Sequence, residues 1–161
     1  MSNEQPILIA FDGSADAQAA VAQVAEQLPG ASAIVLAVWE PRLVQALRLT
    51  WSGTVLVPND VEDEDRDAEK FAKELAEQGA QLADLAGLKA TPRWAADTHT
   101  VWEEILAVAA AEDVRMIVTG TRGLHGVRAA LGSVSSRIVH HATVPVLVVP
   151  SAQTNAARAE A

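Results

Sequence analysis

The most informative stretch of the sequence is Gly120-Thr-Arg-Gly123-Leu-His-Gly126-Val-Arg-Ala-Ala-Leu-Gly132-Ser133. It follows Met116-Ile-Val-Thr119, an apolar run typical of a buried strand, and precedes residues 133–142, whose pattern predicts a helix. Glycines in such a loop let backbone N–H groups close on a phosphate, and a helix N-terminus adds about half a positive charge. The stretch therefore predicts an anion site; the alternative is a plain surface loop between a buried strand and a buried helix.

The distribution of charge agrees with an anion site. The chain carries 21 Asp and Glu against 12 Lys and Arg, a net charge of −9, yet no carboxylate side chain lies between Val114 and Ala159. The arginines of that segment are Arg115, Arg122, Arg128, Arg137 and Arg158. An acidic protein that keeps carboxylates off one segment does not repel a small anion there.

Length and composition limit the class of protein. A chain of 161 residues predicts one domain with a substantial core. The acidic balance argues against a general nucleic-acid binder, and the absence of cysteine excludes disulfides, thiolate metal sites and cysteine nucleophiles. No apolar run approaches the roughly 20 residues of a membrane span, and the first residues lack the pattern of a signal peptide. We therefore expect a cytoplasmic protein that does not enter the membrane.

Short apolar runs alternate with helical patterns along the chain, which predicts a parallel sheet with crossover helices. Besides 115–119, the predicted strands are 7–11, 33–38, 90–95 and 145–149. Pro92 places its strand at an edge of the sheet. Ser14 is expected to cap one helix, and Thr100 with Glu103 forms the capping box of another. The fold class is therefore α/β: a single-domain, open, five-stranded parallel sheet with helices on both faces, Rossmann-like.

Two further segments complete the predicted organisation. Residues 67–86 form an amphipathic helix, with Phe71, Ala72, Leu75 and Leu82 on the face expected to be buried. Residues 39–65 are an insert whose apolar part, 43–58, either packs on the domain as a loop or serves as a lid or a dimer contact. The domain is expected to span residues 1–150, and residues 151–161 to form a flexible tail.

With these motifs in place, the chain resembles the universal stress protein family over about residues 5–150. The resemblance rests on Ile-Ala-Phe-Asp12-Gly-Ser14, on Leu-Ala-Val38, on the loop from Gly120 to Ser135, and on Pro145-Val-Leu-Val-Val149. The nucleotide-binding branch of the family has Gly, two residues, Gly, nine residues, Gly, then Ser or Thr. This sequence has eight residues between Gly123 and Gly132.

The resemblance implies an adenine nucleotide alpha hydrolase-like fold that binds ATP or an AMP-class nucleotide with Mg²⁺. Asp12 and Val38 would approach the adenine, while Gly120, Arg122 and Gly123 would line the ribose and phosphates. Gly132, Ser133, Val134 and Ser135 would hold phosphates through backbone N–H groups and hydroxyls. From the residues alone, Ser133 could instead be a plain helix cap, and Asp12 could be a turn former without a ligand.

The function expected from the resemblance is a stress-response regulatory switch that responds to the bound nucleotide. The alternative is a nucleotide-free, dimeric interaction module. No catalytic residue and no protein metal site is predicted, so hydrolysis would at most be slow. An ATP pyrophosphatase is rejected because its Ser-Gly-Gly-x-Asp-Ser loop is absent after the first strand. Expected partners are an adenine nucleotide, an unknown protein, and a second copy paired through strand 146–149, whose apolar edge carries no charge.

Overall fold

A computed structural model describes residues 5–42, 44–45, 61–121, 132–152 and 156. Its centre is one sheet of five parallel strands, as the sequence predicts, and these strands follow the order β3-β2-β1-β4-β5. The strands are β1 (Ile7–Ala10), β2 (Ser32–Trp39), β3 (Lys89–Ala96), β4 (Met116–Gly120) and β5 (Val146–Val149). The strand that contains Pro92 lies at an edge, where its missing N–H leaves no partner unsatisfied.

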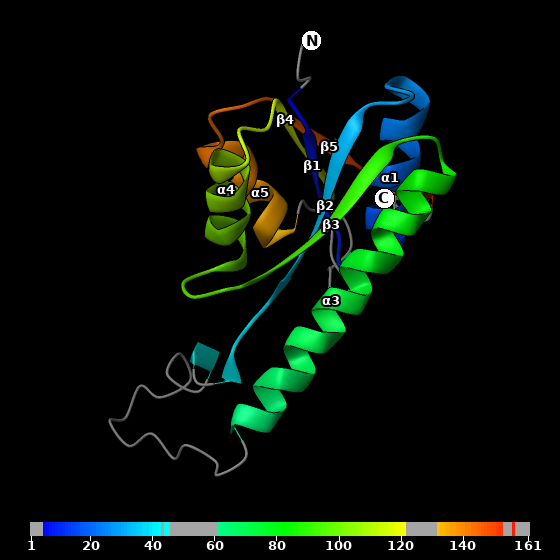
Figure 1. Cartoon of the computed structure of the whole chain (residues 1–161). Helices are drawn as coiled ribbons and strands as arrows, with labels where there is room; N and C mark the ends of the chain where they lie inside the picture. Colours follow the sequence, from blue (N-terminus) through cyan, green and yellow to red (C-terminus); the bar gives the residue numbers. More distant parts are fainter. Residues whose placement is uncertain (1–4, 43, 46–60, 122–131, 153–155, 157–161) are drawn as a thin grey trace.

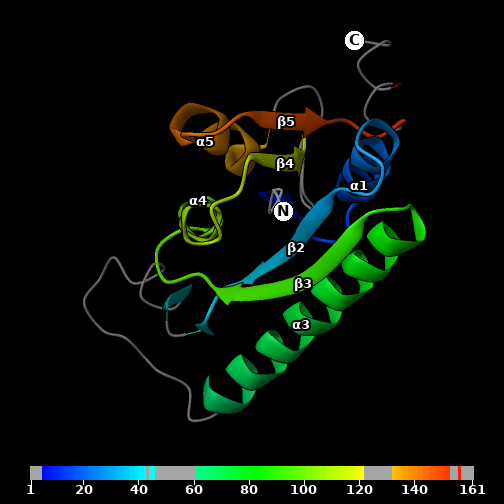
Figure 2. The same ribbon diagram turned by 45° about the horizontal axis from the view of Figure 1, so that its top comes forward.

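Helices cover both faces of the sheet (Figure 1). One face carries α1 (Ala15–Gln27) and α3 (Val61–Leu85), and the other carries α4 (Val101–Ala111) and α5 (Ser133–His141). Figure 2 shows α3 running beside β3, with α4 and α5 across the sheet from it. Each face has its own apolar core, and the inner strands β1, β2 and β4 contribute to both, which explains why their sequences are apolar throughout.

The chain reverses its direction across the sheet between β1 and β4. From β1 it moves outward through β2 to β3, and it then crosses to β4 on the other side of β1. Ligands of open parallel sheets bind beyond the carboxyl ends of the strands at such a reversal. Residues that follow β1 and β4 are therefore placed at the position where a ligand is expected.

Two helices begin at the predicted caps. The Ser14 hydroxyl accepts a hydrogen bond from the N–H of Ala17, 3.2 Å away. At the start of α4 the Thr100 hydroxyl accepts from the N–H of Glu103, and it also lies 2.5 Å from the Glu103 carboxylate. Both caps satisfy N–H groups that have no acceptor within the helix.

The orientation of α3 differs in part from the prediction: Ala72 is buried and Leu75 is partly buried, as expected, but Phe71 and Leu82 are not. The side chains that face the sheet are small, and Phe71 and Leu82 are exposed to 64% and 38%. The reason is close packing: a Cβ added to Gly79 would lie 2.7 Å from the Val35 side chain and 2.8 Å from the Phe11 ring. Large side chains do not fit so near the sheet, so they lie on the flank of the helix. The buried positions are Ala72, Ala76, Ala80 and Ala83.

The predicted insert, 39–65, lies partly outside the described residues. Its last residues belong to α3, which begins at Val61 rather than Asp67, and the Asp65 carboxylate accepts a hydrogen bond from the N–H of Arg42. Ser151, the first residue of the predicted tail, is buried. No helix in the described part of the chain is long and apolar enough to cross a membrane.

Candidate functional site

The site is organised around a hydrogen bond that joins the two ends of the glycine-rich segment. The N–H of Gly132, just before α5, donates to the carbonyl oxygen of Thr121, just after β4, over 2.7 Å. The N–H of Thr121 in turn donates to the carbonyl of Val149 in β5. Residues 122–131, which include the predicted site residues Arg122 and Gly123, lie outside the described residues. The strand end and the helix start are therefore held side by side, independently of the segment between them.

Among the described residues, no side chain caps the N-terminus of α5. Gly132 occupies the cap position with φ −59° and ψ 157°, so Ser133 is the first residue of the helix rather than its cap. The N–H groups of Ser133, Val134 and Ser135 have no acceptor within the helix, because the first helical bond runs from Ser136 to Gly132. The first turn also contains no acidic residue. An anion is the natural partner of such a helix end.

The two serines of this turn differ in what their hydroxyls do. Ser133 is exposed, whereas Ser135 is buried and its hydroxyl lies 3.0 Å from the Thr121 carbonyl and 3.1 Å from the Gly132 carbonyl. Ser135 thus ties the start of α5 to the end of β4. Its hydroxyl is therefore engaged in structural contacts. Its backbone N–H, which has no acceptor within the helix, is the donor that an anion would use.

The end of β1 lies beside the ends of β2 and β4. Ile9 pairs with Val35 and with Val118, and continuing the first register places Asp12 beside Val38. Asp12 accepts a hydrogen bond from the N–H of Ser14 over 3.0 Å, so the expected turn is present. Val38 is partly buried and packs on the same apolar cluster as Val134. The structure thus brings all described members of the predicted site to one edge of the sheet.

A buried carboxylate that sequence reasoning missed stands behind this edge. Asp16 is only 4% exposed; it accepts a hydrogen bond from the Thr121 hydroxyl and another, 3.0 Å long, from the N–H of Ser151. It therefore joins α1 to the residues that follow β4 and β5. The local sequence does not reveal this role, because an Asp in the first turn of a helix is usually exposed and interacts with the helix dipole.

Gly120 also has a packing role. A Cβ added to it would lie 2.7 Å from the Asp16 Cβ and 3.1 Å from the backbone nitrogen of Ala17. Only glycine lets the first turn of α1 approach β4 this closely. The predicted contact of Gly120 with a ligand remains a prediction.

Asp97 is a second buried carboxylate that sequence reasoning did not single out. It follows β3, is fully buried, and accepts a hydrogen bond from the N–H of His99 over 2.8 Å. Its own N–H donates to the carbonyl of Trp39. Asp97 thus shapes the turn into α4 as Asp12 shapes the turn into α1. The available signal was an Asp two positions beyond the end of the predicted strand 90–95.

Several basic residues of the carboxylate-free segment have structural roles. Arg115 precedes β4 and so lies at the opposite, amino edge of the sheet, where its backbone N–H donates to the carbonyl oxygen of Pro6. His140 contacts the Ser136 carbonyl over 2.8 Å, and His141 stacks on Trp102 with ring centroids 4.8 Å apart. These contacts give both histidines a structural role.

An open hollow of about 700 Å³ lies at the amino edge, lined by Pro6, the first residues of β2 and β3, Asp84 and Glu112. Its acidic side chains disfavour a phosphate there. Within the described residues, no three side chains of His, Cys, Asp or Glu gather to hold a metal ion. The carboxyl edge, with its uncapped helix, remains the better anion site.

Comparisons with known proteins agree on one family. Residues 4–150 match the Universal stress protein family. A universal stress protein of Thermus aquaticus is 34% identical over 147 residues, covering 89% of this chain and 96% of that protein. Universal stress protein YxiE of Bacillus subtilis is 33% identical over 148 residues, covering 89% and 97%.

Solved structures show the same fold. The universal stress protein of Archaeoglobus fulgidus in complex with dAMP superposes with a TM-score of 0.63 at 22% identity, covering 90% of this chain and 97% of that one. A family member from Arabidopsis thaliana with AMP bound gives a TM-score of 0.60 at 15% identity, covering 91% and 92%.

Proposed function

Because the chain belongs to the universal stress protein family, we propose that it binds an adenine nucleotide at the carboxyl edge of its sheet and acts as a nucleotide-responsive regulatory protein in the stress response. The observation that carries this proposal is the hydrogen bond between Gly132 and Thr121, which holds an uncapped helix N-terminus beside the end of β4. The nucleotide complexes of the Archaeoglobus and Arabidopsis proteins support the choice of ligand.

The phosphates are expected at the first turn of α5. The N–H groups of Ser133, Val134 and Ser135 supply donors, and the helix dipole favours negative charge at the same place. The adenine would lie toward Asp12 and Val38. Between the adenine and the phosphates, the nucleotide would be lined by Gly120, Arg122 and Gly123. Mg²⁺ would be carried by the phosphate oxygens of ATP, since this ion commonly keeps its waters and takes few protein ligands.

A proline substitution tests the role of the backbone. Ser133→Pro removes one N–H group at the first helical position, where proline is well tolerated, and the ψ of 157° at Gly132 suits a residue before proline. Loss of a charge-assisted hydrogen bond of about 1.5–3 kcal/mol predicts at least a tenfold weaker affinity for ATP by calorimetry. Ser133→Ala is the matched control, because it keeps the N–H and removes only the hydroxyl.

The outcomes separate the main proposal from its alternative. Weaker binding by Ser133→Pro but not by Ser133→Ala supports a backbone phosphate site. Equal affinities in all three proteins would place the ligand elsewhere. If the purified wild-type protein contains no nucleotide and shows no heat with ATP, AMP or dAMP, the nucleotide-free interaction module becomes the better description.

We further propose that the protein is a homodimer paired through β5. This strand lies at the margin of the sheet, so one row of its backbone groups faces away from β4 (Figure 2). Its residues Val146–Val149 are all apolar, and an edge of this kind tends to pair with another strand. Two copies related by a two-fold axis would extend the sheet without leaving this edge open.

A further inference from the structure

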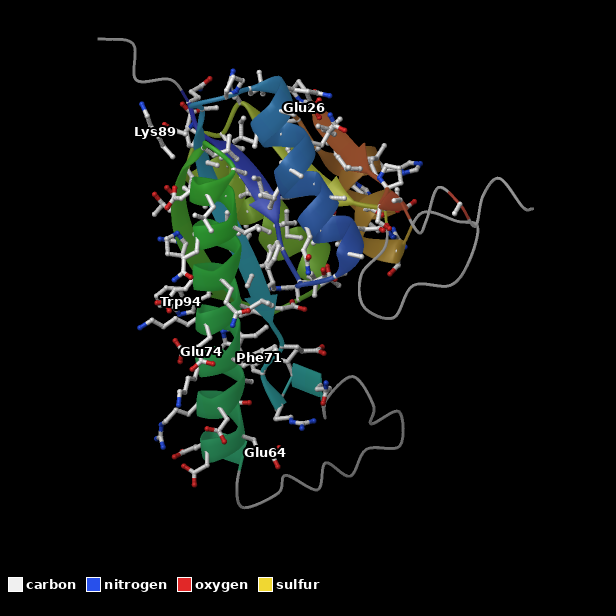
Figure 3. All side chains as sticks on the ribbon, turned by 90° about the vertical axis from the view of Figure 1, so that its right-hand side faces the viewer. Glu26, Glu64, Phe71, Glu74, Lys89 and Trp94 are labelled. Carbon is white, nitrogen blue, oxygen red and sulfur yellow. The ribbon has the colours of Figure 1, made fainter. Side chains whose placement is uncertain are left out.

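The large apolar side chains that are exposed concentrate on one helix. Among the described residues there are four, and three of them lie on α3: Phe71 at 64%, Leu82 at 38% and Leu85 at 88% exposure. Figure 3 shows Phe71 on one side of α3 and Trp94 of β3 on the other. Phe71 therefore lies on the flank of the helix that faces away from the edge strand, and at about 100° per residue Leu82 and Leu85 fall on the same side of α3 as Phe71.

These positions follow the spacing of a coiled-coil seam. Counting from Phe71, the steps of four and three residues reach Leu75, Gln78, Leu82 and Leu85 in turn. This seam, which we call the α3 stripe, takes the a and d positions of a heptad. Leu75 is partly buried against the protein's own core, and the others stand on the open flank. A single stripe with this period matches the apolar face of one partner helix.

The charged residues at the g positions beside the α3 stripe have one sign. In the same heptad register, Asp67 and Glu74 take the g positions of successive heptads, and neither forms an ion pair with another described residue. The basic residues of α3 point elsewhere: Arg66 pairs with Asp63 over 2.9 Å, and Lys73 lies over the Trp94 ring. With about 100° of rotation per residue, Arg66 and Lys73 share the opposite flank, and Lys70 lies between that flank and the acidic g positions.

We propose that the α3 stripe is a docking surface for a cationic amphipathic helix of another protein. The apolar residues of that helix would cover Phe71, Leu82 and Leu85, and its Lys or Arg residues would pair with Asp67 and Glu74. A second copy fits poorly, because an antiparallel pair of α3 helices brings acidic g positions together in a chain whose net charge is −9. The sheet-facing residues Ala72 and Ala76 are already buried, so the partner contacts one flank only.

The experiment uses the full-length protein and designed helical peptides of about three heptads. The probe has Leu at a and d and Lys at e and g; one control peptide has Glu at e and g, and another has the probe's composition in scrambled order. Binding is measured by fluorescence anisotropy. The variant Phe71→Ser/Leu85→Ser should weaken binding of the Lys peptide roughly tenfold or more. Val139→Ser, which removes an exposed apolar side chain from α5, should leave it unchanged.

The second part of the experiment reverses the charges beside the α3 stripe. Asp67→Lys/Glu74→Lys should reduce affinity for the Lys peptide roughly tenfold and raise affinity for the Glu peptide. Equal binding of the ordered and scrambled Lys peptides would refute the proposal, since it would show general attraction to an acidic protein. Absence of peptide binding would also refute it. In that case, two further results would identify the occupant of the α3 stripe. If Phe71→Ser/Leu85→Ser dissociates a dimer, the occupant is a second copy of the chain. If deletion of residues 46–58 allows the peptide to bind, the occupant is that segment of the same chain.

Discussion

Replacing Gly120 by alanine tests whether α1 is held against β4 as closely as the structure indicates. The new Cβ would lie 2.7 Å from the Asp16 Cβ and 2.9 Å from its carbonyl carbon. Carbon atoms pack best at about 3.5–4.0 Å, so the first turn of α1 has to move by nearly 1 Å. Side-chain rotation cannot relieve the contact, because the atoms that are struck belong to the backbone or are fixed to it.

The expected loss is about 3 kcal/mol of unfolding free energy. Overpacking a core costs about 1–3 kcal/mol, and weakening the two hydrogen bonds of Asp16 adds about 1 kcal/mol each. Alanine recovers about 0.5–1 kcal/mol by restricting the unfolded chain. For a domain of this size the net loss lowers the melting temperature by roughly 6–12 °C. Urea unfolding followed by circular dichroism measures the free energy directly.

Gly79→Ala is the matched control. Its Cβ would also meet an atom at 2.7 Å, but the atoms concerned are the Val35 methyl and the Phe11 ring. Side chains can yield further than backbone, and alanine within a helix gains about 1 kcal/mol over glycine. We expect a net loss of about 1 kcal/mol. If Gly79→Ala lost as much as Gly120→Ala, the distinction between backbone and side-chain contacts would be wrong.

Three further changes have clear expectations. Asp16→Ala removes the acceptor of the Thr121 hydroxyl and of the Ser151 N–H, and should cost about 2–4 kcal/mol in urea unfolding; a loss below about 1 kcal/mol would contradict the buried network. Ser135→Ala should cost about 1 kcal/mol yet leave ATP affinity in calorimetry unchanged, since the N–H remains; a large loss of affinity would mean that the hydroxyl contacts the ligand. Val148→Lys should convert the proposed dimer to monomers in light scattering, and an unchanged mass would remove β5 from the interface.

The sequence predicts the sheet well because its signals are local. Fully apolar runs bounded by turns identify the inner strands, and Pro92 places β3 at an edge. The Ser14 and Thr100 caps are predictable for the same reason, since a cap depends on residues only a few positions apart.

Contacts between distant segments were harder to predict. Asp16 appears in sequence as an ordinary first-turn acid, because its partners Thr121 and Ser151 are more than a hundred residues away. The face of α3 was misjudged for a related reason. Hydrophobicity favours Phe71 as a buried residue, but with the close approach at Gly79 the fully buried side chains of α3 are alanines. The short distance between α3 and the sheet determines which face of the helix is buried, and this distance cannot be predicted from the amino-acid composition of the helix.

The hydrogen bond between Thr121 and Gly132 has a consequence for how this fold can vary. A segment whose two ends are already tied can lose or gain a residue at little expense: the closure entropy of a loop of this length changes by only about 0.1 kcal/mol per residue. We therefore expect that the segment of a relative can be placed between Thr121 and Gly132 with the hydrogen bond between these two residues kept. The ligand preference of the protein would then change while the residues of its core stay the same.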